Sequence, residues 1–365
     1  MTVAKKEEYP LMDLDNNIVG WESQDDPMNP RNYHPSRKWF LMLLISTITL
    51  ISPFTSSVFS PAVPYAEKEF GVTSTILGTL SVTGYLFGYT TGPMFISSLS
   101  EMFGRRVILS AANVEFVAFQ IGCALAPNIS TLIAFRFLTG IGGSACLTTG
   151  SGVLADLFVA KQRGLAMTAY SSGILVGPVL GPVLGGYGWS TGNSGLSYLG
   201  LGVGFILGQI VFGMFSDRVV TQLEARNNGI YEPEMRLSIS IFFSGFIPVS
   251  FFWYGWAVQA HTHWIVPIIG LAPFAFGMVG IYNTMQTYVI DSYPRYAASA
   301  MAALVVTRSL MGALMPLAGP EMYKSPNYGW GNSLLGFITL AMVPLPVLFH
   351  RFGGALRKKL DLRLD

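Results

Sequence analysis

The chain has 365 residues, of which 51% are hydrophobic and only 12% are charged. Soluble domains carry about 25% charged residues, so this composition excludes a disordered protein and an ordinary soluble domain. The formal net charge of +2 gives no electrostatic reason to expect a nucleic-acid partner, and two cysteines are too few for a disulfide scaffold. A helical bundle embedded in a lipid bilayer remains.

Ten apolar stretches are long enough to cross a bilayer, since one span needs about 20 mostly apolar residues. They predict an all-α membrane protein, a bundle of about ten transmembrane helices. The predicted spans are Trp39–Ser60, Ile76–Leu99, Val107–Ala126, Leu132–Leu154, Leu165–Gly186, Ser194–Phe215, Leu237–Val258, Trp264–Ile290, Ala297–Ala318 and Gly331–His350.

These spans divide the chain into two halves of five helices each. A polar N-terminal tail covers residues 1–38, and its acidic residues argue against a cleavable signal peptide. The first half covers residues 39–186, a short outer connection covers 187–193, the second half covers 194–350, and a basic tail covers 351–365. We expect the protein to be a monomer in the lipid bilayer.

Lysine and arginine set the expected orientation, because cytoplasmic loops of membrane proteins are enriched in both. With the N-terminus in the cytoplasm, eighteen basic residues fall in cytoplasmic segments and only Lys68 and Lys324 fall in outer loops. Arg136 and Arg308 lie within spans. The bias predicts a multi-pass protein with both termini in the cytoplasm.

Small residues recur at every fourth position in four of the spans. Such ridges let helix backbones approach closely, which drives helix association in lipid. They fit either static packing or helices that slide or rock against each other. The ridges are Gly84, Gly88 and Gly92; Gly140, Ser144, Thr148 and Gly152; Gly173, Gly177, Gly181 and Gly185; and Gly200, Gly204 and Gly208.

A short internal repeat relates the two halves. Glu101 follows Gly92 by nine residues, Asp217 follows Gly208 by nine residues, and each acidic residue is preceded by a serine. Both acidic residues lie at a predicted cytoplasmic helix end, next to arginine. Parallel repeats of this kind are typical of some secondary transporters.

Three motifs resemble those of the major facilitator superfamily. The stretch Gly92–Arg106 resembles the family's loop between the second and third helices, in which Glu101 replaces the usual aspartate. Arg136–Gly143 looks like the second motif, whose arginine is thought in the family to assist proton movement. Gly173–Gly186 resembles the antiporter motif. The matched residues are Gly92, Glu101, Gly104, Arg105 and Arg106 in the first motif, and Gly177, Gly181, Pro182, Gly185 and Gly186 in the antiporter motif.

Further stretches narrow the resemblance to one branch of the family. Trp21–Tyr33, Arg308-Ser309 and Gly329–Gly336 are similar to segments of fungal twelve-helix drug:proton antiporters. The resemblance implies a secondary transporter of the plasma membrane that exports small amphipathic organic molecules, such as drugs, toxins or secondary metabolites. It implies a proton gradient as the energy source, with no cofactor.

The chain departs from this branch at one place. The family has twelve helices in two sets of six with a long cytoplasmic loop between them, whereas Gly186 is followed at once by residues that precede the family's eighth helix. The sixth helix, the loop and the seventh helix are therefore expected to be missing as one block. Removing two helices together preserves the topology, but it leaves a second hypothesis: a truncated member that cannot transport.

Two charged side chains within spans are candidates for proton coupling. Glu115 is the only acidic residue deep in a predicted span, so it fits either a proton carrier or a protonated packing residue. Arg136 fits either proton coupling or a side chain that reaches the outer interface. For Arg308 the resemblance implies a structural or conformational role. Asp156, Asp217 and Asp291 lie at helix ends, where we expect them to pair with nearby arginines.

Polar and aromatic groups in two spans are candidates for a substrate cavity, because an apolar cavity with a few polar groups suits amphipathic compounds. They fit interfacial belt residues as well. They are Tyr85, Tyr89, Tyr282, Asn283 and Gln286. The spans carry no clustered His, Asp and Glu residues, so we expect neither an enzyme nor a metal site. The chain contains no phosphate-binding loop, which argues against ATP-driven transport.

Overall fold

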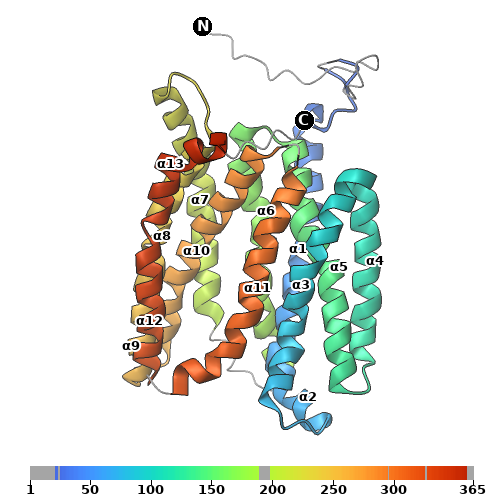
Figure 1. Ribbon diagram of the computed structural model, residues 1–365, viewed down its shortest axis with the longest axis vertical. Coiled ribbons are helices and arrows are strands. Elements are labelled where there is room, and N and C mark those ends of the chain that lie inside the picture. The colour runs from blue at the N-terminus through green and yellow to red at the C-terminus, as the bar shows by residue number, and fades with distance from the viewer. Residues whose placement is uncertain (1–20, 24, 189–197, 295, 325–326, 360–365) are drawn as a thin grey trace.

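The computed structural model describes residues 21–359 apart from 24, 189–197, 295 and 325–326. Long helices run side by side along one axis (Figure 1). The first long helix begins, and the last helix ends, at the same end of the bundle, which we call the terminus end. This arrangement matches the expected even number of crossings.

The helices of the two halves follow each other in chain order. The first half contains α1 (Pro35–Val58), α2 (Val63–Glu69), α3 (Thr75–Phe103), α4 (Arg105–Ala124), α5 (Ile129–Leu157) and α6 (Arg163–Gly188). The second half contains α7 (Leu199–Arg226), α8 (Leu237–Ser244), α9 (Phe246–Gln259), α10 (Ile265–Ser292), α11 (Ala297–Lys324), α12 (Asn327–Met342) and α13 (Leu345–Lys359).

Nine helical segments in the described part of the chain are long and apolar enough to cross a membrane. They coincide with nine of the ten predicted spans. The remaining prediction, Ile76–Leu99, lies within the 29-residue helix α3, whose many glycine, serine and threonine residues make it less apolar. Because α3 packs against α5 and α11 rather than standing alone, it completes the bundle as its tenth long helix.

Several helix boundaries differ from the prediction. The predicted span Leu237–Val258 consists of α8 and α9, which meet at Gly245. The span Gly331–His350 is divided into α12 and α13 before Leu345, where Pro344 cannot continue a helix. Helix α7 runs to Arg226, well beyond the predicted end at Phe215, because apolar patterning marks only the part of a helix that lies in lipid. The predicted start at Ser194 lies outside the described residues.

The glycine ridges lie where helices cross. The ridge of α3 faces that of α5, the ridge of α6 lies against the backbone of α1, and the ridge of α7 lies against α10. A Cβ atom added at Gly177 would lie 2.9 Å from both the Leu50 carbonyl oxygen and the Phe54 amide nitrogen. The expected close approach of the backbones is confirmed. Motion along these ridges stays a prediction.

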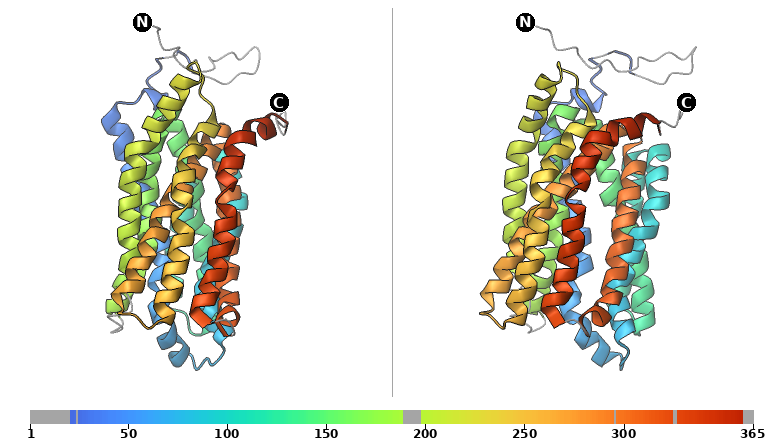
Figure 2. Two further views of the ribbon diagram at one scale, coloured as in Figure 1. Left: turned by 90° about the vertical axis from the view of Figure 1, so that its left-hand side faces the viewer. Right: turned by 60° about the vertical axis from the view of Figure 1, so that its left-hand side comes forward.

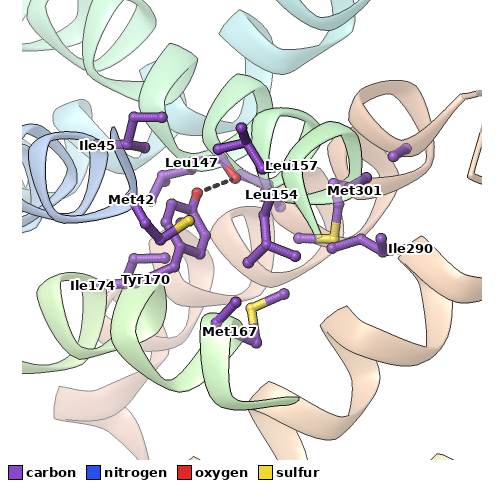
Figure 3. Packing of buried hydrophobic residues seen from close by; sticks show 14 of the residues in the cluster. Met42, Ile45, Leu147, Leu154, Leu157, Met167, Tyr170, Ile174, Ile290 and Met301 are labelled. Atoms are coloured by element: carbon purple, nitrogen blue, oxygen red, sulfur yellow. Dashed lines mark hydrogen bonds between the residues drawn. The ribbon is translucent and has the colours of Figure 1, made fainter. Parts of the chain in front are cut away.

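The largest buried cluster joins the two halves near the terminus end. Met42 and Tyr170 of the first half belong to the same cluster as Ile290 and Met301 of the second half (Figure 3). The Tyr170 hydroxyl donates to the carbonyl oxygens of Cys146 at 2.8 Å and Leu147 at 3.0 Å. The halves thus share one core here. The two turned views show the long helices running side by side along the same axis (Figure 2).

Candidate functional site

Glu101 connects the two halves at the terminus end. It lies in the last turn of α3, and its carboxylate accepts hydrogen bonds from the backbone N–H of Ser299 at 3.0 Å and the Ser299 hydroxyl at 2.5 Å. Ser299 lies in the first turn of α11. The N-terminus of a helix presents free N–H groups and a positive dipole end, so a carboxylate is stabilised there.

Asp217 repeats this contact in the opposite direction. It belongs to α7 of the second half, and its carboxylate accepts hydrogen bonds from the backbone N–H groups of Gly164 at 3.1 Å and Leu165 at 3.0 Å. Both N–H groups lie at the start of α6 in the first half. The internal repeat that the sequence indicates is therefore present in three dimensions as two mirrored carboxylate–helix contacts.

An arginine supports each of these carboxylates. Arg105 donates to the Ser100 hydroxyl at 3.1 Å, lies 3.9 Å from Glu101, and contacts Asp156 at 3.5 Å. In the second half, Arg236 donates to the Ser216 hydroxyl at 3.3 Å, contacts Asp217 at 2.8 Å, and contacts Asp291 at 3.3 Å. The expected pairing of Asp156, Asp217 and Asp291 with arginines is confirmed. The repeat thus extends over a serine, two carboxylates and an arginine in each half.

Asp291 is the centre of a buried ion cluster between the halves. Its carboxylate contacts Arg163 of α6 at 2.6 Å and Arg236 at 3.3 Å, and the Asp291 side chain is 0% exposed. The Tyr231 hydroxyl donates a further short hydrogen bond to it. Burial, and secondly the negative charge of Asp291, raise the pKa of the Tyr231 phenol, so it stays protonated as a donor at neutral pH.

The sequence did not single out several members of this cluster. Arg163 and Arg236 counted only as part of the cytoplasmic charge bias, and Tyr231 carried no motif. The available signal was the position of Asp156 and Asp291, each of which closes a long apolar helix of the repeat. Arg105 precedes Asp156 by 51 residues and Arg236 precedes Asp291 by 55, so the two spacings are similar.

The remaining residues of the first motif shape the turn after α3. Gly104 has a φ of +91°, a conformation that side chains with a Cβ atom rarely adopt, and it allows α4 to begin directly at Arg105. The Arg106 side chain is exposed. Gly92 lies against Ile141 and Ser144 of α5.

Arg136 lies buried in the first half, away from the terminus end. Its guanidinium donates to the carbonyl oxygen of Ser56 at 2.9 Å and stacks on the Phe59 ring at 4.6 Å, while its Nε has no hydrogen-bond partner among the described residues. The Tyr85 ring of α3 lies 5.7 Å from the Arg136 guanidinium. The hydroxyls of Tyr85 and Tyr89 both contact the Ser52 hydroxyl, at 3.0 and 2.6 Å. These two tyrosines are therefore satisfied within the first half.

A buried polar chain crosses between the halves at mid-height. The Gln209 amide donates to the Ser171 hydroxyl of α6 at 3.0 Å, and the Asn283 amide of α10 donates to the Gln209 oxygen at 3.0 Å. The Asn283 oxygen has no partner among the described residues. Asn283 thus belongs to the contact between α7 and α10 and does not line the cavity described next.

A cavity of about 220 Å³ lies between α9, α10 and α11. Three of the residues singled out from the sequence line it, namely Tyr282, Gln286 and Arg308. The Arg308 guanidinium lies 5.0 Å from the centre of the Tyr282 ring. The other lining residues are Ile247, Met278, Ile281, Met285, Leu304 and Val305. The structure therefore brings two of the five candidate cavity residues together with one of the two membrane-depth arginines.

Glu115 lies halfway along α4 and is half-buried. Its carboxylate makes no hydrogen bond or ion pair with the residues that the structure describes. Only 6% of the most apolar window of α4 is buried, against 56% in α5. Glu115 is thus carried by the least covered long helix of the bundle.

The antiporter motif lines the contact between α6 and α1. Gly177, Gly181 and Gly185 lie against the α1 backbone, and Pro182 is buried within the same stretch. Gly186 belongs to the final turns of α6. The motif thus fixes how closely two long helices of the first half approach each other.

The two halves differ in which helix faces are covered. By the repeated serine, carboxylate and arginine positions, α3, α4 and α5 correspond to α7, α8–α9 and α10. Helix α9 has two long neighbours, α10 and α12. Its counterpart α4 packs against α5, which corresponds to α10, but no described helix takes the place of α12 beside it. Conversely, α1 packs along α6, while no helix of the described part of the second half takes that place beside α11, where the cavity lies.

The described part of the chain has no cluster of metal-ligating side chains. Among its residues, no group of three or more His, Cys, Asp and Glu side chains is arranged to hold a metal ion.

The family model described as the Major Facilitator Superfamily matches this chain in two segments, residues 45–190 and 186–316. The chain belongs to the major facilitator superfamily. It is therefore a multi-pass membrane transporter and not an enzyme. The MFS transporter cpaT of Aspergillus oryzae is 34% identical over an alignment of 453 residues, which covers 93% of this chain and 91% of the relative. That alignment is longer than the 365 residues of this chain, so it includes residues of the relative that have no counterpart here.

Two further comparisons agree with this assignment. The efflux pump radE of Floropilus chiversii is 31% identical over 94% of this chain and 85% of the relative. The solved structure of the xylose transporter XylE from E. coli is 16% identical, with a TM-score of 0.58 over 86% of this chain and 97% of that chain. The likeness to XylE concerns the fold alone.

Proposed function

We propose that this protein exports small amphipathic organic molecules by proton antiport. The observation that carries the proposal is the pair of mirrored contacts in which Glu101 and Asp217 each bind the helix N-terminus of the opposite half. Such contacts hold two rigid halves together at one end and can be exchanged for contacts at the other end. Rocking of two repeats about a central site is how secondary transporters alternate access.

Proton coupling is assigned to Glu115, with Arg136 in a supporting role. A carboxylate at membrane depth with no described partner is costly to ionise in lipid, so its protonation changes with access to water. The antiporter motif along α6 supports the direction of exchange, because its resemblance is to drug:proton antiporters. We place both termini in the cytoplasm, as the basic residues favour, and the protein in the plasma membrane as a monomer.

Reconstituted flux tests the proposal. Purified protein in liposomes with the pH dye pyranine inside would receive an imposed pH gradient and one of three amphipathic fluorophores: cationic rhodamine 6G, a neutral dansyl ester, or an anionic dansyl acid. We expect gradient-dependent movement of at least one fluorophore, with counter-movement of protons. If correctly folded protein moved none of them, the export proposal would be wrong.

A second candidate is a shortened member of the family that does not transport. Three observations favour it: the family model matches two segments that meet at residues 186–190, the alignment with cpaT extends beyond this chain's length, and two helix faces lack the partner that their counterparts have. In the repeat, the uncovered face of α4 is where a sixth helix would pack, and the uncovered face of α11 is where a seventh helix would pack.

Restoring the expected block separates the two candidates. The helix pair and loop of cpaT would be inserted between Gly186 and Tyr187, and both chains would be compared in the same flux assay. Flux only in the extended chain would support the candidate that this shorter chain does not transport. It would also show that transport requires the uncovered faces of α4 and α11 to be filled. Equal flux in both chains would reject that form. Insertion of a scrambled helix pair of equal length is the control.

A further inference from the structure

The cavity between α9, α10 and α11 contains a cation at membrane depth. Arg308 lies eleven residues after the start of α11, which corresponds to about 16 Å along a helix. It forms no ion pair with the residues that the structure describes, and its guanidinium stacks on the Tyr282 ring. A charged arginine at this depth costs about 2.5–3.5 kcal/mol on insertion scales, so it calls for an anionic or strongly polar partner.

Two further polar groups in the wall of this cavity are unsatisfied. The Tyr282 hydroxyl and the Gln286 side-chain oxygen are buried without a hydrogen-bond partner among the described residues, and Gln286 is only 2% exposed. Buried polar groups are normally hydrogen-bonded, and those that are not call for an explanation. Both residues lie one turn apart on α10 and line the cavity together with Arg308.

The rest of the cavity wall is apolar and adaptable. Met278 and Met285 lie on α10, and Leu304 and Val305 lie on α11. Methionine side chains are flexible and polarisable, so they accommodate apolar bodies of different shape. A volume of about 220 Å³ is below the about 300–1,000 Å³ typical of sites that enclose a whole drug-sized ligand. The cavity therefore suits the charged head and adjoining carbons of a longer molecule.

We propose that this cavity binds amphipathic organic acids, with the Arg308 guanidinium pairing with their carboxylate. Rotation of the two neighbouring side chains toward the ligand would let the Tyr282 hydroxyl donate to the same anionic group and the Gln286 oxygen accept from a hydroxyl or amide N–H of the ligand. This assignment rests on the proposed export function and names its substrate class. An additional apolar helix could also fill this groove, but it would leave Arg308 without an anionic partner. An anionic ligand is therefore favoured.

Equilibrium binding tests the assignment without requiring flux. The full chain in phosphatidylcholine nanodiscs would be titrated with 11-(dansylamino)undecanoic acid and with its methyl ester, with empty nanodiscs subtracted. We expect the acid to bind at least tenfold more tightly than the ester. Arg308→Gln should abolish this preference, Arg308→Lys should retain most of it, and Arg226→Gln, at an exposed arginine at the end of α7, should leave it unchanged. The melting temperature of each variant would show that it is folded.

The outcomes are separable. Equal binding of acid and ester, or an unchanged preference in folded Arg308→Gln, would overturn the assignment. Displacement of the acid by added phosphatidylglycerol would identify a lipid headgroup as the anion and also overturn it. Loss of acid binding on insertion of the cpaT helix pair would show that the groove is a helix seat and overturn it as well. A retained preference in a chain that shows no flux would uphold the site while rejecting export.

Discussion

Charged residues of the bundle fall into two groups by their partners. At the terminus end, Arg163 and Arg236 are buried and share Asp291. At membrane depth, Arg136 and Arg308 have no carboxylate partner among the described residues and stack on aromatic rings instead. Paired charges hold a structure, whereas unpaired charges in lipid indicate sites of function.

Asp291→Asn should destabilise the protein strongly. The substitution leaves two buried arginines facing each other, and breaking a buried pair costs about 3–5 kcal/mol. We expect a fall of several degrees in the melting temperature measured in detergent. Lys161→Gln is the matched control, because Lys161 pairs with Glu224 at 3.0 Å but its side chain is 61% exposed. That change should cost less than about 1 kcal/mol. Similar effects of both substitutions would contradict a structural role for the cluster.

Glu115→Gln should uncouple proton movement from substrate movement. Glutamine has nearly the same shape but cannot release a proton, so any remaining flux should no longer respond to an imposed pH gradient. The measurement is the pyranine signal in proteoliposomes. Glu115→Asp keeps the carboxyl group and should preserve coupling. Normal coupling in the glutamine variant would assign the proton to another group.

Glycine residues set how closely two helices pack. The α1 backbone is contacted along α6 by four of them: Gly173, Gly177, Gly181 and Gly185. In lipid, close backbone approach replaces the hydrophobic effect as the source of association between helices. Gly312 in α11 has more room around it. A Cβ atom added there would lie 3.8 Å from its nearest described neighbour, Leu86, which is an ordinary van der Waals distance.

Gly177→Ala should weaken the contact between α1 and α6. The new Cβ atom would lie 2.9 Å from backbone atoms of α1, so one helix must shift. Alanine favours a helix over glycine by about 1 kcal/mol, which makes a net loss of stability diagnostic of the clash. Gly312→Ala should be neutral or slightly stabilising. Melting temperatures of the two variants would decide, and an equal gain in both would refute the packing argument.

The ionic contacts between the two halves are concentrated at the terminus end. The mirrored contacts of Glu101 and Asp217, the Asp291 cluster and the shared apolar core all lie near the terminus end. The halves are also joined along their length, by the packing of α11 on α3 and by the hydrogen bond from Gln209 to Ser171. Opening at this end requires both carboxylates to leave their helix N-termini.

Combined Glu101→Gln and Asp217→Asn substitutions should open the terminus end. Removing both charges weakens attraction to the helix dipoles, each worth about 0.3–1 kcal/mol and more where partly buried. Spin labels at Met102 and Asn228, in a background with Cys123 and Cys146 replaced by serine, would report the separation of the halves. We expect a longer and broader distance distribution in the double variant. An unchanged distribution would show that the core alone holds the halves together.

The sequence predicted which segments span the membrane and which family features they carry, because both depend on local composition and short motifs. Its errors were at helix boundaries, at the break between α8 and α9, and at α2, since these depend on contacts beyond a hydropathy window. Glu101 and Asp217 were recognisable as a repeat, but the helices that they bind were not.

Apolar length alone determined that this protein crosses a bilayer many times, because lipid imposes the same requirement on every span. Tertiary structure alone decided that Tyr282, Gln286 and Arg308 share one cavity while Tyr85 and Tyr89 are satisfied elsewhere. The reason is that hydropathy does not record which helix faces meet. Those faces are set by glycine crossings and by carboxylates that reach from one half to the other.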